Sequence, residues 1–256
     1  PIIISKNTNV DSFTYLDQVA IDPQKGFINS TYPKAYYGVQ FPISYQEMQE
    51  NKGSSKIVDL MGARLDQAMM SLNDRINSDL YLDGTGNSSK DILGLLAMIP
   101  SSTTSSTYAG IDGTATGLTD WTQVQIEDAI ADTFAALDNC YYSLSDGNDR
   151  PNLIVTDALG MQNYNTYLRA ATGIQSMVSP KKADGSYAII SHLGVEIMLD
   201  QAAPQQSSTL PIYHMLNTKY LGFYFDAEPM KKVDPSDQYA TVFKSPVTCQ
   251  LVTSRR

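Results

Sequence analysis

The sequence predicts an α+β fold, in which helices and mixed sheets are built from separate stretches of the chain. Apolar residues recur every three or four positions from Ile57 to Leu80, which is the period of one helix face. A helix, a strand and a second helix follow in that order between residues 122 and 171. Short β-branched and aromatic runs then continue from residue 186 to residue 252, which is typical of strands.

The first 52 residues show no helix period and predict extended arms and a long hairpin. They are rich in Tyr, Pro, Asn and Ser, and Ala35 to Ile43 is a short alternating stretch. Turn residues at Asp22 to Gly26 and at Asn29 to Thr31 predict a wide turn between the two strands. Because a two-stranded segment is marginal by itself in water, we expect it to find its partners on a neighbouring copy.

The residues from about Ser54 to Leu80 predict one long amphipathic helix of roughly 40 Å. Ser54 or Ser55 is a suitable N-cap, and Gly84 is a suitable stop. We expect its apolar stripe to face a sheet and not solvent. The stripe consists of Ile57, Leu60, Met61, Leu65, Ala68, Met69, Leu72, Ile76 and Leu80. A coiled coil is the alternative, but the stripe is not a strict heptad and only one such helix exists.

Two connecting segments follow the long helix. The stretch from Asp83 to Lys90 predicts a turn, and an apolar run from Ile92 to Ile99 comes after it. Ser101 to Gly117 consists mostly of Ser, Thr and Gly, which is the composition of a surface linker. We therefore expect the main domain boundary in that linker.

The second half of the chain predicts a helix, a strand, a second helix and a series of strands. The first helix, Thr122 to Tyr142, places Ile126, Ile130, Phe134, Leu137 and Tyr141 on one face. Asn152 to Thr156 is a short β-branched strand, and Ala158 to Ala171 is the second helix. The late strands fall within Ser186–Leu199, Leu210–Phe225 and Tyr239–Val252.

The composition favours a subunit whose outer faces are covered by neighbours over a plain extracellular protein. Charged residues make up 18% of the chain, against about 25% in ordinary domains, while sixteen Tyr and ten Met are present. The net charge of −9 without a basic cluster argues against nucleic-acid binding as the main task. No apolar run approaches the ~20 residues of a membrane span, and the stretch from Pro1 to Ser5 lacks the charged and apolar regions of a signal peptide. A cytoplasmic origin is expected.

The residues that could carry chemistry predict no catalytic, cofactor or metal site. Cys140 and Cys249 are too far apart in sequence for a metal knuckle, and we expect reduced thiols in the core. The loop at 83–90 lacks the spacing of a phosphate-binding loop. His192 and His214 are isolated, so we expect structural histidines, although a hydrolase that uses one of them as a base remains an alternative. The acidic pairs are interpreted as solvated charges: Glu47 with Glu50, and Asp226 with Glu228.

The order of several short motifs resembles that of tailed-bacteriophage major capsid proteins of the Hong Kong 97 fold. In that family a long "spine" helix ends in a sequence similar to the stretch from Asp79 to Gly86, Asp-Leu-Tyr-Leu-Asp-Gly-Thr-Gly. The further matching segments, in order, are Tyr45–Gly53, Ile92–Leu95, Tyr108–Asp112 before Trp121, residues 126–164 and Leu193–Ile197. The likeness covers nearly the whole chain.

The resemblance implies a domain layout. Residues 1–10 would be the remnant of an N-terminal arm and residues 11–45 the extended E-loop. Residues 46–118 would form the first part of the peripheral P-domain, 119–225 the axial A-domain and 226–256 the closing part of the P-domain. Family members carry a longer arm, so a maturation protease removes a preceding segment or the sequence is incomplete. The implied contacts of the E-loop with a neighbouring subunit are Tyr32, Tyr36, Tyr37 and Phe41.

The resemblance also implies a function and partners. The chain would assemble with itself into pentameric and hexameric capsomers of an icosahedral head, without catalysis and without a cofactor. The head would enclose DNA without sequence-specific binding and would not involve a membrane. Portal, scaffold and decoration proteins are further partners of such a subunit, which is assembled in the bacterial cytoplasm and resides in the virion. Within the same fold, the alternative is an encapsulin-like nanocompartment shell.

Overall fold

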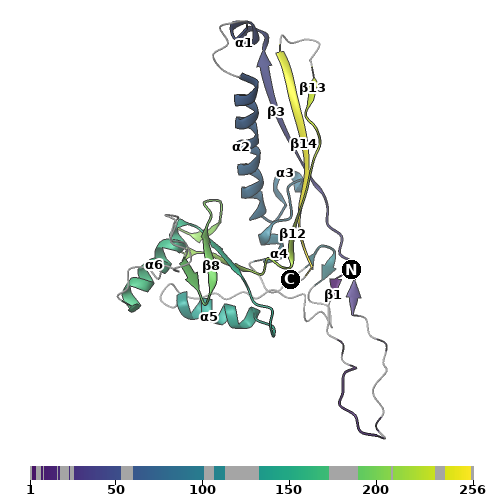
Figure 1. Ribbon diagram of the computed structural model, residues 1–256, viewed down its shortest axis with the longest axis vertical. Coiled ribbons are helices and arrows are strands. Elements are labelled where there is room, and N and C mark those ends of the chain that lie inside the picture. Colours follow the sequence, from purple (N-terminus) through teal and green to yellow (C-terminus); the bar gives the residue numbers. More distant parts are fainter. Residues whose placement is uncertain are drawn as a thin grey trace. The chain divides into compact units, whose positions relative to one another are not determined.

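The structure is a computed structural model of the 256-residue chain. It describes residues 2–3, 7, 9–15, 17, 23, 26–52, 60–100, 107–112, 133–172, 190–208, 210–233 and 240–254. The chain divides into two units, whose elements are labelled in Figure 1. Unit 1 contains Pro1–Thr31, Met98–Gly222 and Thr253–Arg256, and unit 2 contains Tyr32–Ala97 and Phe223–Val252. The domain limits implied by the resemblance stay predictions.

Unit 2 is built on an antiparallel sheet with β14 (Ala240–Thr253) at its centre. On one side β14 pairs with β3 (Ala35–Ser44) over ten residues, from Ala240 opposite Ser44 to Cys249 opposite Ala35. On the other side lie β12 (Leu221–Ala227) and β13 (Lys231–Val233). The late strand predicted from the sequence is confirmed. The expectation that the extended first segment pairs with a neighbouring copy is wrong for β3, since a strand late in the same chain supplies its partner.

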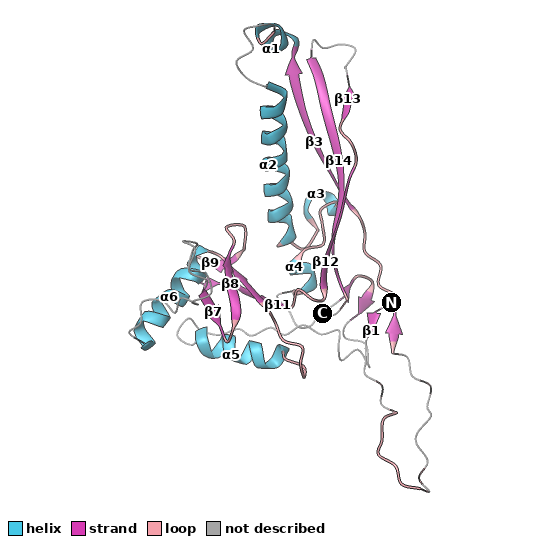
Figure 2. Ribbon diagram, viewed as in Figure 1, coloured by secondary structure: helices cyan, strands magenta, loops and turns pink. Residues whose placement is uncertain are grey.

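The long helix α2 (Leu60–Leu80) packs against β3, as Figure 2 shows. The predicted spine helix is confirmed over these residues, whereas its predicted N-cap lies outside the described residues. Leu72 and Ile76 are buried as expected, but Met69 is 38% exposed. The expectation for Met69 is wrong. The buried side chains of α2 are those of Leu72, Ile76 and Asp79, and Met69 lies to one side of the helix face that these three residues define.

The short helix α1 (Tyr45–Glu50) was missed by the sequence analysis. Ser44 and Glu47 form a reciprocal capping box at its start. The Glu47 backbone N–H donates to Ser44 Oγ at 3.2 Å, and the Ser44 N–H donates to Glu47 Oε2 at 3.1 Å. The spacing Ser44-x-x-Glu47 is the signal that could have predicted this helix. Two shorter helical turns follow α2, namely α3 (Gly86–Ser89) and α4 (Leu95–Met98).

Unit 1 is built on a mixed sheet whose strands are in the order β11-β6-β8-β7. These strands are Tyr213–Leu216, Leu153–Thr156, Val195–Leu199 and Ile190–His192, respectively, and β6 and β8 are parallel. Two helices, α5 (Thr133–Leu144) and α6 (Ala158–Thr172), share one core with the sheet. The buried residues of this core are Leu137, Tyr141, Ile154, Tyr164, Val195, Ile197 and Met215. The predicted helix, strand and helix are confirmed, although residues 122–132 lie outside the described part.

The described residues of unit 1 also contain three small antiparallel pairs: β1 (Ile2–Ile3) with β2 (Phe27–Ile28), β4 (Thr107–Tyr108) with β5 (Ile111–Asp112), and β9 (Gln205–Ser207) with β10 (Leu210–Pro211). The β4–β5 pair falls inside the predicted surface linker. Tyr108 and Ile111 are only 2% and 1% exposed, so this part of the segment is packed, contrary to the expectation. No helix in the described residues is long and apolar enough to span a membrane.

Candidate functional site

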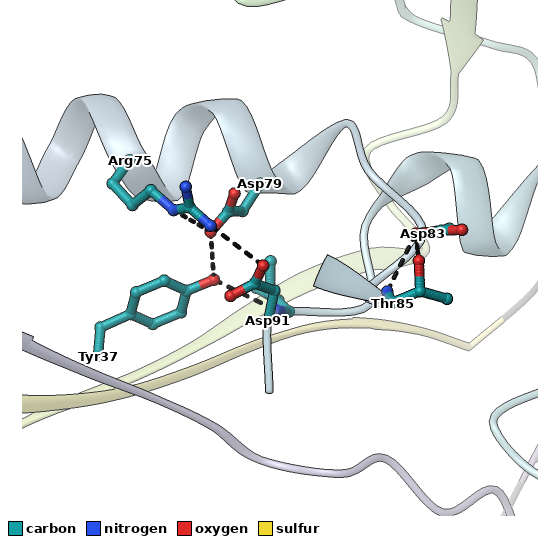
Figure 3. A network of polar contacts seen from close by, with 7 residues as sticks. Tyr37, Arg75, Asp79, Asp83, Thr85 and Asp91 are labelled. Carbon is teal, nitrogen blue, oxygen red and sulfur yellow. Dashed lines mark hydrogen bonds and ion pairs between the residues drawn. The ribbon is translucent and has the colours of Figure 1, made fainter. Parts of the chain in front are cut away.

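A network of four side chains ties β3 to the end of α2 and to the loop that follows (Figure 3). Arg75 Nε donates to Asp79 Oδ2 at 2.8 Å, and a terminal nitrogen of Arg75 donates to Asp91 Oδ2 at 3.1 Å. The Tyr37 hydroxyl donates to Asp79 Oδ2 at 2.8 Å and accepts from the backbone N–H of Ile92 at 3.2 Å. One cation therefore bridges two carboxylates that lie on different segments.

Burial determines the electrostatics of this network. The side chains of Asp79 and Asp91 are 1% and 5% exposed, whereas that of Arg75 is 55% exposed. Burial raises the pKa of Tyr37 far above its ordinary value, which keeps the hydroxyl protonated as a donor to Asp79. The adjacent Asp79 carboxylate raises the pKa of Arg75. The network contains no activated nucleophile. Its role is structural, because it joins β3, the end of α2 and the loop that follows.

The loop after α2 depends on three glycines, each for a steric reason. Gly84 has a φ of +79°, which other residues rarely adopt. A Cβ on Gly86 would lie 2.3 Å from Asp91 Oδ2, and a Cβ on Gly94 would lie 2.3 Å from the Leu80 carbonyl oxygen. The motif Asp83-Gly84-Thr85-Gly86 is therefore a tight turn that ends the helix, as predicted, and folds back on it.

The side chain of Asp83 fixes the start of this turn. Asp83 Oδ1 accepts from the Thr85 backbone N–H at 3.0 Å and from Thr85 Oγ1 at 2.7 Å. These hydrogen bonds lower the pKa of Asp83, so the carboxylate stays ionised. Further along, the Gly94 N–H donates to the Leu82 carbonyl at 3.1 Å. The segment from Asp83 to Gly94 thus closes back on the end of α2.

The four residues predicted to contact a neighbouring subunit have different surroundings. Phe41 is 7% exposed and stacks on Phe243 with ring centroids 5.4 Å apart, and Tyr37 belongs to the polar network. Both therefore contribute to the fold of their own chain. Tyr36 is 74% exposed and Tyr32 is half-buried. A contact of any of the four with a second copy stays a prediction, and Tyr36 offers the most surface for one.

The histidines lie in the interior of unit 1. His192 is 5% exposed. Its Nδ1 is 3.2 Å from the Tyr164 hydroxyl, and its Nε2 is 3.0 Å from Asp138 Oδ1. Burial lowers the pKa of His192 against the opposing pull of Asp138. Burial also lowers the pKa of His214 to about 4. The burial of the two rings agrees with structural histidines, and the expectation that neither acts as a catalytic base stays a prediction.

Both cysteines are free thiols, as expected. Cys249 is fully buried on β14, and burial raises its pKa to about 11. Burial also raises the pKa of the half-buried Cys140 on α5. Because the thiolate is the reactive form, neither side chain is activated for nucleophilic chemistry.

The extended segment before β3 carries a row of exposed apolar side chains. Val10, Phe13 and Phe27 are 76%, 71% and 69% exposed, and Tyr15 is 100% exposed. These side chains are therefore left in solvent by their own chain, and a contact of this segment with another copy stays a prediction.

Comparisons with known proteins identify the fold. No protein-family profile matches the sequence, and no curated protein matches it. Among solved structures, the chain is similar to the "Cyanophage A-1(L) capsid asymmetric unit", with a TM-score of 0.62, 20% identity, and coverage of 95% of this chain and 81% of that one. A structure from Mycobacterium phage Adephagia gives a TM-score of 0.56 at 11% identity, covering 99% and 77% of the two chains.

A third similar structure is the holo-SrpI encapsulin complex from Synechococcus elongatus. Its TM-score is 0.52 at 11% identity, and the match covers 93% of this chain and 74% of that one. The similarity to these structures extends over nearly the entire chain, but the sequence identity is low. It therefore shows the fold of the chain alone. The chain has the α+β Hong Kong 97 capsid fold predicted from its motifs.

Proposed function

We propose that this chain is the major capsid protein of a tailed bacteriophage, a non-catalytic subunit that assembles with copies of itself into the icosahedral head around the genome. The observation that carries the proposal is the likeness to a cyanophage capsid over 95% of the chain. That span includes the spine helix, the long sheet and the core of unit 1.

The surface properties support assembly. The charged fraction of 18% and the exposed aromatic arm fit a subunit whose faces are covered by neighbours. The net charge of −9 fits a wall that does not trap the packaged DNA. The proposed partners are further copies of the chain in pentamers and hexamers, with portal, scaffold and decoration proteins joining them. Assembly takes place in the bacterial cytoplasm, and the mature location is the virion.

The proposal gives the segment around residues 11–45 the role of the E-loop. The exposure of Phe13 and Tyr15 supports this role, because their own chain leaves them open to solvent. The proposed contacts near the base of the E-loop are Tyr36, which lies on β3, and Tyr32, which precedes that strand. Tyr37 and Phe41 support the loop by anchoring β3 to α2 and β14.

Sedimentation and electron microscopy of the purified full-length chain test the proposal. A shell subunit sediments as capsomers or as megadalton particles, and images show closed icosahedral shells. A hydrolase would sediment as a small oligomer. Only small oligomers at every protein concentration and ionic strength would overturn the proposed function.

A loop-shortening variant tests the arm. Replacing residues 24–30 by a two-residue Asn-Gly turn removes β2 but leaves α2 and the core of unit 1 untouched. Circular dichroism should remain that of the parent, while closed shells on a sucrose gradient become rare or fragile. Unchanged shell yield and heat resistance would mean that the arm is dispensable, and loss of the dichroism signal would mean that it belongs to the subunit's own core.

The encapsulin likeness supports a second candidate, the shell of a nanocompartment. The content and the vertices of particles isolated from the native source distinguish the two. Heads with a portal vertex, a tail and packaged DNA favour the phage, whereas closed particles that contain a cargo protein and no genome favour the nanocompartment.

A further inference from the structure

A hollow of about 440 Å³ lies in unit 2, between the residues that lead into β3 and the loop that follows α2. Its lining consists of residues 33–36 from the first segment and of residues 83–85, 89–91 and 93 from the second. All of these residues belong to unit 2. Because sites for small molecules commonly have volumes of roughly 300–1,000 Å³, the hollow is large enough for one.

Two lysines of the lining, Lys34 and Lys90, carry positive charges that the described part of the chain does not neutralise. Both side chains are exposed, and no acid among the described residues forms an ion pair with either of them. Lys34 Nζ lies 5.3 Å from the centroid of the Tyr224 ring. This contact orients the ammonium group but leaves its charge in place. The hollow therefore presents two cations to a ligand.

The two acids of the lining already have partners, as Figure 3 shows. Asp91 Oδ2 accepts from Arg75 at 3.1 Å, and the Asp91 side chain is only 5% exposed. Asp83 Oδ1 accepts from the backbone N–H and from the hydroxyl of Thr85. Both carboxylates are thus engaged by groups of their own chain, whereas the two ammonium groups are not.

The backbone beside Lys90 has an unusual conformation. Asn87, Ser88 and Ser89 have φ values of 47°, 61° and 61°, which residues other than glycine rarely adopt. Three such residues in succession cost free energy, and conformations of this kind cluster at ligand-binding sites. Ser89 also belongs to the lining, and its hydroxyl can donate a hydrogen bond next to the Lys90 charge.

The remaining side chains of the lining are largely apolar. They include Pro33, Ala35, Tyr36 and Leu93. Tyr36 is 74% exposed, so its ring is open to contact by a ligand. Aromatic side chains stack on flat rings such as nucleobases. The hollow thus combines a cationic part with an aromatic and aliphatic part.

We infer that this hollow binds a small phosphate monoester, with Lys34 and Lys90 contacting the phosphate oxygens and the Ser89 hydroxyl donating to one of them. A phosphate monoester carries a charge of about −1.5 to −2 at pH 7, which matches two lysines, whereas a carboxylate carries only one charge. The net charge of −9 disfavours a long nucleic-acid strand as the ligand. The inference does not depend on the proposed function.

The sequence pattern of residues 83–90 excludes a phosphate-binding loop of the usual spacing, and the structure is consistent with that. The second lysine comes from a separate segment, since Lys34 precedes β3 and Lys90 follows α2. A motif within one segment could not reveal such a pair.

Isothermal titration calorimetry of the unassembled full-length chain tests the inference. The probes are adenosine 5′-monophosphate, inorganic phosphate and adenosine, at low ionic strength. The two phosphates should bind with saturation, and adenosine should bind at least about tenfold more weakly than its monophosphate. Lys34→Met and Lys90→Met should each weaken phosphate binding by about tenfold. Tyr36→Ala should weaken binding of the nucleotide and leave that of inorganic phosphate unchanged, which distinguishes a nucleotide from free phosphate as the ligand.

The matched control is Lys231→Met with Lys244→Met, which removes two exposed lysines of the same unit that lie outside the hollow. It should bind both phosphates like the parent, and circular dichroism should show that every variant is folded. An equal loss of affinity in this control and in Lys34→Met with Lys90→Met would show an adventitious ion only and overturn the inference. Absence of saturable phosphate binding by the parent would also overturn it. Shell formation, which tests the proposed function, is a separate measurement.

Discussion

The two four-stranded sheets in the described part of the chain pack against different numbers of helices. In unit 1, strands of three to five residues share a core with α5 and α6, and the cluster includes residues from both helices and three strands. In unit 2, strands of ten and fourteen residues have α2 on one face, and the buried residues of α2 are Leu72, Ile76 and Asp79. The sheet of unit 1 thus shares its core with two helices, whereas the long sheet of unit 2 packs against the single long helix α2.

Buried carboxylates join separate segments in both units. In unit 1, Asp157 accepts from the N–H groups of Leu159 and Gly160 at the start of α6, and also from the side-chain amide of Gln205. In unit 2, the Arg75 network joins segments that are distant in sequence, from Tyr37 to Asp91. A buried ion network of this kind stabilises only while its geometry is intact. The long helix is therefore more sensitive to single changes than its small apolar face suggests.

The largest effect expected from this comparison is that of a charge on the buried side of α2. Leu72 is 4% exposed, and Leu72→Asp removes apolar contacts and buries a carboxylate without a partner. Deleting a buried Leu side chain alone costs about 2–5 kcal/mol, and the unpaired charge adds to that. We expect insoluble or protease-sensitive protein and no particles.

The neighbouring Met70, which is 67% exposed on the same helix, supplies the control. Met70→Asp should change the free energy of unfolding by less than about 0.5 kcal/mol. Normal solubility and particle yield for Leu72→Asp would mean that α2 does not pack on the sheet through this residue. Equal damage from both variants would mean that the whole helix surface is covered.

A smaller effect is expected from acid, and it should fall on unit 1, which contains both histidines of the sequence. His214 has a pKa of about 4 when folded, because it is buried, and about 6.5 when unfolded. The folded state therefore favours the neutral form. The contribution of neutral His214 to the free energy of unfolding is fully present above pH 6.5, and it is lost as the pH falls toward 4. This shift corresponds to roughly 3 kcal/mol.

Urea unfolding at pH 7 and pH 4.5 measures the loss for the parent and for His214→Gln. The carboxylates titrate in both proteins, so the difference between them isolates His214. The variant should show a weaker pH dependence than the parent. If both proteins lose the same free energy of unfolding over this interval, His214 is not buried in neutral form.

The sequence was sufficient to predict features that depend on local periodicity. The stripe that ends at Leu80 predicts α2, and the β-branched run at Leu153 predicts β6. The order of the motifs, from the Asp83-Gly84-Thr85-Gly86 turn to the helix, strand and helix of unit 1, predicts the fold, and the likeness to a solved capsid structure confirms it. These signals lie within one element or between adjacent elements.

Features that depend on distant partners could not be predicted. Nothing around Ala35 to Ser44 indicates that β14, some two hundred residues later, completes its sheet. The burial of Asp79 could not be predicted either, because an acidic residue is expected to be exposed unless it has a partner. Its partners are Arg75 and Tyr37, and Tyr37 is distant in sequence. Tyr108 and Ile111 are buried within a stretch whose composition predicts a linker.

The smallest expected effect concerns two glycines of unit 2 that the sequence alone does not distinguish. A Cβ on Gly94 would lie 2.3 Å from the Leu80 carbonyl oxygen and 2.6 Å from that of Leu82, and both are backbone atoms that cannot rotate away. A Cβ on Gly38 in β3 would have no atom within 4 Å. Gly94→Ala should therefore lower the free energy of unfolding by about 1–3 kcal/mol, the usual cost of overpacking. Gly38→Ala should raise it by about 0.4–1 kcal/mol, because it restricts only the unfolded chain. Urea unfolding of both variants tests the pair; equal and small effects would show that the Asp83-to-Gly94 segment does not fold tightly against the end of α2.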